Sequence, residues 1–501
     1  MQTRIAVLTL FLAFAALLVS ECEAQQVRPL LIPWPRKITM GKGVVVFNTK
    51  LSIAVAGNNL RAARQVAETF AADLSDLGFA AAVLKDSEAA GADITLRLAL
   101  DRSLGREGYR MSVDRGMTIR AGAELGLFWG TRTALQLLRK GPGVSVPKLS
   151  VFDKPEFGYR GLMVDVARQF HSIEFHRKMV KKLAAYKMSI YHIHFADDQS
   201  YTLPSTAFPA LPTPDRHYTK EQLRDLAALA AQYHVTIIPE IDLPGHASAL
   251  SAAIPDMVCR GKQPGGVICI GSERSLAAVE ALVTEAMDLF PGPYFHIGAD
   301  EVDYNRWNDC PDCMVAKARY GVKDNEALYN CFINRMNCFV KSKGRKMIIW
   351  EGFKVGSKPT IDKDILIDQW ANSYAMPRDV AKAGYDMINA SWTPLYICRT
   401  SATAPETIAE WSAIHFGDPH PPKELEELLT VEKTKQLKGI CMCSWENSEQ
   451  VQDAVLWGIG QSAEGYAAPA ARLPIVAERA WSGSTPADDL ISRVGRDMRR
   501  E

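Results

Sequence analysis

The 501-residue chain lacks a net charge of either sign. Lysine and arginine together number 58, against 57 aspartates and glutamates, which gives a formal net charge of +1. No basic stripe is present, so nothing favours binding to nucleic acid or to an anionic membrane. The apolar share of 47% and the charged share of 23% are ordinary for a globular protein. We therefore expect a neutral or weakly charged small molecule as partner, and no nucleic acid.

Long apolar runs are scarce, and the prominent one lies near the N-terminus. Arg4 precedes a run from Ile5 to Val19, and Cys22-Glu23-Ala24 then offers a cleavage site. The run is too short for a membrane span, and the arrangement is typical of a signal peptide. Cys22 also allows a lipoprotein, but Glu21 stands where a small residue would be expected. We predict that residues 1–24 are removed and that the mature chain, without a membrane span, is exported to the periplasm or the outside.

Cysteine is also scarce, with ten residues in all, and loss of Cys22 with the signal peptide leaves nine. An odd number in an exported protein leaves at least one thiol free or paired outside the chain. Cys259 and Cys269 flank a loop rich in glycine and proline, which favours a local disulfide. Cys310 and Cys313 can form a structural disulfide or half of a zinc site. Zinc would need two further ligands, which the sequence does not identify.

Residues 27–155 are predicted to form a small α/β accessory domain. It contains short β-like runs and two helical patterns: 44–47, 94–98, 109–113 and 117–120 for the strands, 59–77 and 124–140 for the helices. None of the runs ends in a cluster of acids, so we interpret the domain as non-catalytic. Lys148 to Phe157, with Pro147 and Pro155, is predicted to connect it to the rest of the chain.

Residues 156–501 alternate between strand-like runs and amphipathic helical patterns. Eight strands are predicted, at 161–166, 189–195, 235–241, 294–298, 346–350, 365–370, 387–391 and 439–444. This number over so long a segment is typical of a (β/α)8 barrel, the TIM barrel, with insertions. A doubly wound open sheet is the alternative, but the Gly-rich phosphate loop that often marks one is absent.

Acids and histidines recur where the predicted strands end. The second strand ends in His194, Asp197 and Asp198, the third in Glu240, Asp242 and His246, and the fourth in His296, Asp300 and Glu301. Charges are kept out of buried strands unless they are paired or used, and the carboxyl ends of barrel strands form the catalytic rim. Helix capping explains one or two of these acids but not their recurrence.

Three tryptophans follow at other strand ends, Trp350, Trp370 and Trp445. Indole rings suit a sugar pocket because they stack on the apolar C–H faces of pyranose rings. Asp300 and Glu301 are adjacent on a strand and therefore point to opposite sides, which places them badly as acid and nucleophile across one bond. This geometry favours a reaction in which the substrate supplies its own nucleophile.

Four ordered segments resemble the family 20 glycoside hydrolases, the β-N-acetylhexosaminidases. They are Tyr159 to Arg168, His194 to Gln199, Ile238 to His246 and His296 to Glu301. The resemblance runs from about residue 27 to residue 482. It implies an exo-acting, retaining β-N-acetylhexosaminidase, in which the 2-acetamido group of the terminal sugar is the nucleophile, on a (β/α)8 barrel preceded by an accessory domain. It implies no cofactor and no metal.

The resemblance also implies roles for single residues. Glu301 would be the general acid/base, and Asp300 would orient the acetamido group, whose carbonyl oxygen Tyr396 would hold. Because Glu301 must stay protonated in a partly apolar pocket lined by tryptophans, we also expect its pKa to be raised. Arg160 would bind hydroxyls of the terminal sugar. Asp197 and His246 would set the charge state of Glu301. The remaining substrate-binding residues would be Trp350, Trp370, Trp445 and Glu446.

Three departures from the family pattern leave the choice of sugar open. Cys398 stands where the family often has an acid, and Gln169 where it commonly has a histidine. After the last strand the usual Trp-x-Glu reads Trp445-Glu446-Asn447, so Asn447 stands in the place of the glutamate. A non-catalytic glycan-binding relative is therefore an alternative. A metal-dependent barrel hydrolase is another, because His192-x-His194 resembles a metal-binding strand. The sequence predicts neither N-acetylglucosamine over N-acetylgalactosamine or a sulfated sugar, nor an oligomeric state.

Overall fold

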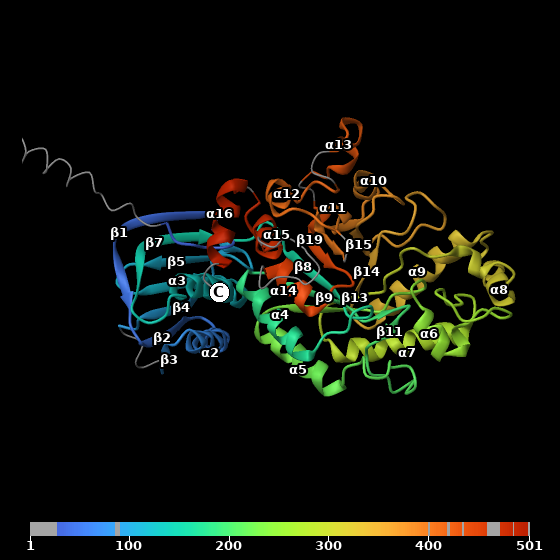
Figure 1. Ribbon diagram of the computed structural model, residues 1–501, viewed down its shortest axis with the longest axis horizontal. Coiled ribbons are helices and arrows are strands. Elements are labelled where there is room, and N and C mark those ends of the chain that lie inside the picture. The colour runs from blue at the N-terminus through green and yellow to red at the C-terminus, as the bar shows by residue number, and fades with distance from the viewer. Residues whose placement is uncertain are drawn as a thin grey trace, which may run out of the picture. The chain divides into compact units, whose positions relative to one another are not determined.

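The computed structural model describes residues 28–85, 91–398, 401–417, 421–432, 435–457, 471–483 and 485–498 (Figure 1). The predicted signal peptide at residues 1–24 lies outside the described residues, so it and the export of the chain stay predictions. The chain divides into two compact units, one of Met1–Leu31 with Pro35–Lys154 and one of Ile32–Trp34 with Pro155–Glu501. Within the described ranges, no helix is both long and apolar enough to cross a membrane.

In the described residues of the N-terminal unit, a seven-stranded mixed sheet is accompanied by the α-helices α2 and α3. The strand order is β1-β7-β5-β6-β4-β2-β3. The strands are β1 (Lys37–Phe47), β2 (Lys50–Gly57), β3 (Ala80–Val83), β4 (Ile94–Leu98), β5 (Tyr109–Val113), β6 (Met117–Ala121) and β7 (Val144–Asp153). Helices α2 (Leu60–Asp76) and α3 (Glu124–Leu138) contact each other and the sheet. Phe70 of α2 and Trp129 of α3 are fully buried, so these helices supply much of the core of the unit.

The prediction that Lys148 to Phe157 form a connection is wrong over most of that segment. Lys148 to Asp153 belong to strand β7, which pairs with β1 on one side and β5 on the other. Pro147 gave the misleading signal, since proline cannot donate to a sheet ladder. It lies outside the part of β7 that pairs with β5, and it faces β1 at Val44, where the register of β1 shifts. Pro147 therefore stands at a position where the sheet does not require a backbone N–H donor.

The C-terminal unit is a closed barrel of eight parallel strands, as predicted. The strands are β8 (Tyr159–Asp165), β9 (Ile190–His194), β12 (Thr236–Glu240), β13 (Tyr294–His296), β14 (Lys346–Trp350), β15 (Leu366–Gln369), β16 (Asp386–Asn389) and β19 (Leu437–Ser444). Parallel pairing of β16 with β19 and of β19 with β8 closes the circle. Each predicted strand is present to within about two residues at either end.

The principal helices between the strands begin at capping residues that the sequence supplies. They include α4 (Ile173–Ala185), α5 (Lys220–Gln232), α7 (Glu273–Leu289) and α9 (Asn325–Ser342). Ser172, Thr219, Ser272 and Asp324 accept hydrogen bonds from backbone N–H groups of the first turns, and Thr219 and Gln222 form a reciprocal capping box. These caps fix where each helix starts and hence where each preceding loop ends.

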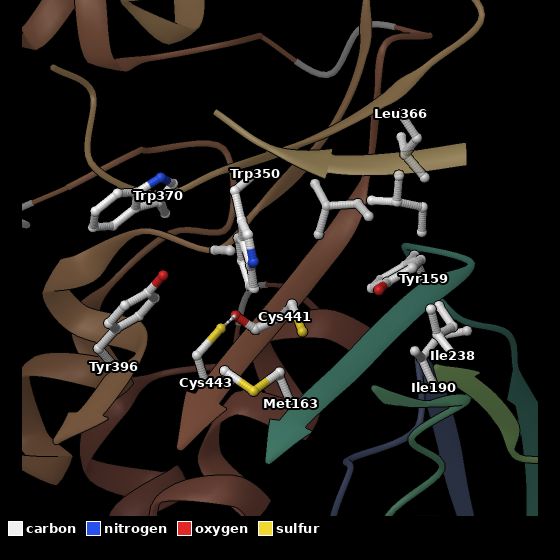
Figure 2. Close-up of a cluster of buried hydrophobic side chains, with 13 residues drawn as sticks. Tyr159, Met163, Ile190, Ile238, Trp350, Leu366, Trp370, Tyr396, Cys441 and Cys443 are labelled. Carbon is white, nitrogen blue, oxygen red and sulfur yellow. Dashed lines mark hydrogen bonds between the residues drawn. The ribbon is translucent and has the colours of Figure 1, made fainter. Parts of the chain in front are cut away.

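The buried cluster inside the barrel has mainly aliphatic side chains, together with Tyr159, at one end and two tryptophans with Tyr396 at the other, which we call the aromatic end. Figure 2 shows Tyr159, Ile190, Ile238 and Leu366 gathered on one side of the buried cluster and Trp350, Trp370 and Tyr396 on the other. Tyr159 and Ile190 are the first residues of their strands, whereas Trp350 is the last of β14. The aromatic end is therefore the carboxyl end, where barrel active sites lie.

Candidate active site

Four polar residues form one layer across neighbouring barrel strands. In the strand register Asp165 pairs with His194, His194 with Glu240, and Glu240 with His296. All four side chains are fully buried. Because parallel strands keep their carboxyl ends together, residues far apart in sequence meet here. The loops that follow this layer carry the rest of the site.

A chain of contacts runs outward from this layer to Glu301. His194 Nδ1 lies 2.8 Å from Glu240 Oε2, and His194 Nε2 lies 2.8 Å from Asp197 Oδ2. His246 then continues it, with Nδ1 3.3 Å from Asp197 Oδ1 and Nε2 3.4 Å from Glu301 Oε2. The predicted pairing of Asp197 and His246 with Glu301 is therefore present in the geometry, and Glu240 and His194 extend it inward.

Charges alternate in sign along this chain. Burial opposes ionisation of Glu240 and Asp197, but the neighbouring histidines outweigh it and hold the pKa of each carboxyl below its usual range. Burial likewise opposes the charged form of His194 and His246, and the surrounding carboxylates raise the pKa of both imidazoles above the usual range. Each buried charge is thus balanced by its neighbours, which is the condition for keeping charges inside a protein.

Asp300 is buried at the head of the loop after β13. Its side chain is 8% exposed, and Oδ1 has no hydrogen-bond partner within the described part of the chain. Burial raises the pKa of Asp300 to about 6. A carboxylate with an unused acceptor suits a ligand that donates an N–H group.

Glu301 differs from Asp300 in both exposure and charge. Its side chain is 55% exposed, and its backbone φ of 47° lies in the left-handed region. A hydrogen bond from His246 lowers the pKa of Glu301, while partial burial raises it by less. The expectation of a raised pKa for Glu301 is therefore wrong. The carboxyl whose pKa is raised is that of the neighbouring Asp300. Asp300 is buried, whereas Glu301 is in direct contact with His246.

The backbone that presents these two acids is held in an unusual conformation. Gly298 has φ +69° and Ala299 has φ 85°. A side chain at Gly298 would lie 1.7 Å from Asp242 Oδ1, and Ala299 N donates to the same oxygen at 3.1 Å. Positive φ at consecutive positions is costly for residues other than glycine, and it persists where the surroundings enforce it.

The predicted aromatic residues do come together. Ring centroids lie 5.8 Å apart for Trp350 and Trp445, 6.0 Å for Tyr396 and Trp445, and 6.1 Å for Trp370 and Tyr396. Trp350 Nε1 donates to Glu240 Oε1 at 2.7 Å, which joins the aromatic wall to the charged chain. Sequence reasoning missed Trp392, which is 50% exposed and stacks on Tyr396 with centroids 5.2 Å apart. The sequence feature that could have identified Trp392 is its position shortly after the end of β16.

The assignment of Arg160 to the sugar site is wrong. Arg160 is the second residue of β8, at the amino end of the barrel, and is fully buried. Its guanidinium donates to the carbonyl oxygens of Phe157 and Lys187 and lies over the ring of Trp481. The side chain is therefore a structural link on the side opposite the site.

Arg168, eight residues further on, holds the place that Arg160 was expected to take. Its guanidinium contacts Asp197 at 2.7 Å, Asp165 at 3.2 Å and Glu446 at 3.7 Å. It also lies 5.2 Å from the ring centroid of Trp445. The signal was its position beyond the carboxyl end of the first barrel strand, whereas Arg160 stands at the start.

The departures from the family pattern have different consequences. Asn447 is buried, and its amide donates to Ile397 O and Ser444 Oγ, so it braces the loop. Glu446 faces Arg168 with a half-exposed side chain and supplies a carboxylate at this position. Cys398 is partly buried, and burial together with Glu446 raises the pKa of its thiol to about 11. It is therefore a neutral group.

The local disulfide predicted between Cys259 and Cys269 is not formed. Both Cys259 and Cys269 are free thiols. Cys259 and Cys269 instead meet Cys310 and Cys313, so four thiols share one place. The sequence placed the two pairs on separate loops and gave no sign that the loops meet.

Within the described ranges, the two histidines of the metal-hydrolase alternative belong to different clusters of potential metal ligands. His192 is grouped with His296 and Asp368, whereas His194 is grouped with Glu240 and Asp242. Both imidazoles contact Glu240, His192 at 2.9 Å and His194 at 2.8 Å. Both histidines therefore belong to the charged network around Glu240.

Comparison with known proteins agrees with the geometry. The glycosyl hydrolase family 20 catalytic domain matches residues 157–484, and domain 2 of that family matches residues 28–154. The β-hexosaminidase of Porphyromonas gingivalis is 30% identical over 352 residues, which cover 64% of this chain and 45% of that protein. The β-hexosaminidase of Vibrio furnissii is 29% identical over 357 residues, covering 64% of this chain and 58% of that protein. The chain thus spans about half the length of these relatives.

Solved structures show the same fold. A Flavobacterium johnsoniae chitobiase has a TM-score of 0.78 at 23% identity, covering 95% of this chain and 73% of that one. A Vibrio harveyi exo-β-N-acetylglucosaminidase, solved with N-acetylglucosamine, has a TM-score of 0.76 at 23% identity, covering 94% and 77%. With its two domains matched in order and its barrel closed, the chain belongs to glycosyl hydrolase family 20.

Proposed function

We propose that this protein is an exo-acting, retaining β-N-acetylhexosaminidase that hydrolyses terminal N-acetylhexosamine residues by substrate-assisted catalysis. The observation that carries the proposal is the pair formed by a buried Asp300 with an unused oxygen and an exposed Glu301 on His246. One carboxyl can face the ring substituent while the other faces the leaving group. Such separate environments give two carboxyls separate roles.

In the proposed reaction the acetamido carbonyl oxygen attacks C1, and the bond from C1 to the leaving oxygen breaks. Glu301 gives its proton to that oxygen, and Asp300 stabilises the positive charge that develops on the acetamido nitrogen. Water then attacks C1 from the opposite face, Glu301 takes its proton, and the ring of the oxazolinium ion opens. Two displacements at C1 give retention. Arg168 and Glu446, rather than Arg160, would bind outer hydroxyls of the sugar.

The proposal is tested with a panel of aryl 2-acetamido sugars assayed for release of the terminal residue. We expect turnover of the N-acetyl-β-glucosaminide or the N-acetyl-β-galactosaminide, because the acid and its partners are all present. A protein that binds N-acetylglucosamine but turns over no member of the panel would be the non-catalytic glycan-binding relative instead. The panel also reads out the choice of sugar, which the departures from the family pattern at Cys398 and Asn447 leave open.

The pH profile of kcat/KM should have its alkaline limb near pH 6. This parameter reports ionisations of the free protein, and the productive form needs an ionised Asp300 together with a protonated Glu301. The pKa of Asp300 is about 6, and that of Glu301 lies below its usual range. Between these two pKa values the productive form is therefore a constant minor fraction of the protein. Above the pKa of Asp300 this fraction declines. Initial rates with an aryl substrate from acidic to neutral pH give the profile.

The Asp300→Asn variant provides the control for this profile. Only Glu301 then titrates in the pair, so the alkaline limb should move to lower pH. An alkaline limb that stays in the same place in Asp300→Asn would contradict the assignment of the raised pKa to Asp300.

A further inference from the structure

We propose that Cys259, Cys269, Cys310 and Cys313 bind one structural zinc ion, which ties together the two loops that carry His246 and Glu301. This site lies outside the proposed chemistry. Each of the four side chains is at least 96% buried, since the exposed fraction is 4% for Cys259 and 0% for the others. The four sulfurs all lie within 4.8 Å of one another.

The spacing of the sulfurs fits a tetrahedral metal site. Zinc binds thiolates at about 2.3 Å, and the edges of a tetrahedron with that radius are about 3.8 Å long. Cys269 Sγ lies 3.8 Å from Cys310 Sγ and 3.8 Å from Cys313 Sγ. A disulfide would join one chosen pair at about 2.05 Å. A sulfur equally distant from two others is a corner of a cluster rather than half of a pair.

The surroundings suit a complex of negative charge. Cys310 is the N-cap of α8 (Pro311–Tyr320) and Cys313 lies in its first turn, where the positive end of the helix stabilises anions. Four thiols lose four protons on binding Zn²⁺, which leaves a complex of charge −2 without any change of oxidation state.

The site joins two loops of the active site. Cys259 and Cys269 belong to the loop between β12 and α7, which also carries His246, and Cys310 follows Glu301 in the loop after β13. Near the chemistry these loops already touch, because a side chain at Gly245 would lie 3.0 Å from Asp300 O. Further out, Trp307 Nε1 donates to Ile268 O at 2.8 Å. The metal would clamp the outer ends of the same two loops and hold His246 against Glu301.

An ion can reach this place from outside. A surface hollow of about 730 Å³ is lined by Cys259, Gly271, Asp312 and charged residues that include Arg260 and Arg319. Arg260 is held there by Asp312 at 2.6 Å. A chelator or a thiol reagent can therefore enter by the same route.

The test measures metal on the full-length protein, independently of turnover. Protein produced with added zinc chloride should contain one zinc per chain by elemental analysis. X-ray absorption at the zinc edge should show four sulfurs at about 2.3 Å. The Cys310→Ser variant should lose most of the zinc, whereas Cys338→Ser, which removes an exposed cysteine, should keep it. Metal-free protein whose peptides show these four cysteines joined as disulfides would overturn the proposal.

A second measurement decides the matter if Cys310→Ser does not fold. Treatment of the wild-type protein with a mercurial and a chelator, followed by a thiol, should lower its Tm by on the order of 5 °C, and added zinc should restore it. The thiol alone should change nothing, since no disulfide is broken. A fall in Tm with the thiol alone, or no recovery with zinc, would also count against the site. Because none of these readouts involves turnover, they stand whether or not the proposed hydrolase activity is found.

Discussion

Replacement of Glu301 by Gln is expected to leave the fold intact and to lower kcat on alkyl or sugar aglycones by about 10²–10⁴-fold, the usual contribution of general acid catalysis. Gln has the shape of Glu but no proton to give. The side chain is half exposed and forms an ion pair with His246, so little packing is lost. The measurement is kcat for a series of substrates that differ only in their leaving group.

The dependence on the leaving group separates an acid from a residue that merely binds. An aryl leaving group that departs readily needs no proton, so the loss there should be much smaller. Glu221→Gln, on the exposed first turn of α5, is the matched control and should behave as wild type. Equal losses on good and poor leaving groups would contradict the role of Glu301 as the acid.

Replacement of Asp300 by Asn should lower kcat/KM by about 10²–10³-fold, as does loss of one group aimed at a developing charge. In wild type the Asp300 carboxylate would face the acetamido nitrogen, which becomes positive when its carbonyl oxygen attacks C1. Asn keeps the shape but cannot balance that charge. Asp300 is buried with one oxygen unpartnered among the described residues, so that oxygen is available to a ligand.

Asp303→Asn offers the control for this variant. Asp303 is exposed on the same loop and caps the short helix Tyr304–Trp307 through the N–H of Asn305, a role that Asn also fills. It should retain wild-type rates. Thiazoline-type inhibitors, which resemble the charged intermediate, should bind wild type far more tightly than substrate and should lose this advantage in Asp300→Asn. Unchanged inhibition in that variant would argue against the contact.

The barrel could be predicted from the sequence because each strand is a short apolar run followed by polar residues. β14 was predicted to the residue, and the layer from Asp165 to His296 follows once parallel strands are placed side by side. The accessory sheet was harder. Strand β7 contains a proline, and a local pattern does not tell whether the missing N–H falls at an irregular position.

The predictions about the site failed where they depended on the running direction of a strand or on residues that are far apart in the sequence. Arg160 lies at the start of β8 and Arg168 lies beyond its end, and only the running direction of the strand tells which end faces the ligand. The relative pKa values of Asp300 and Glu301 depend on burial and on His246, which is 55 residues away in sequence. The four cysteines meet because two loops meet. None of these facts is local, so no periodicity or motif carries them.

The most direct test of the central claim, that the acetamido oxygen of the substrate is the nucleophile, uses aryl glycosides whose acetyl group carries zero, one, two or three fluorine atoms. Fluorine withdraws electrons from the carbonyl oxygen and leaves the size of the group almost unchanged. If the acetamido oxygen is the nucleophile, kcat/KM falls steeply with each fluorine, the 2-hydroxy glucoside is cleaved very poorly, and the first product seen by NMR has the retained configuration. A rate that is flat across the series, or efficient cleavage of the 2-hydroxy sugar, would contradict it.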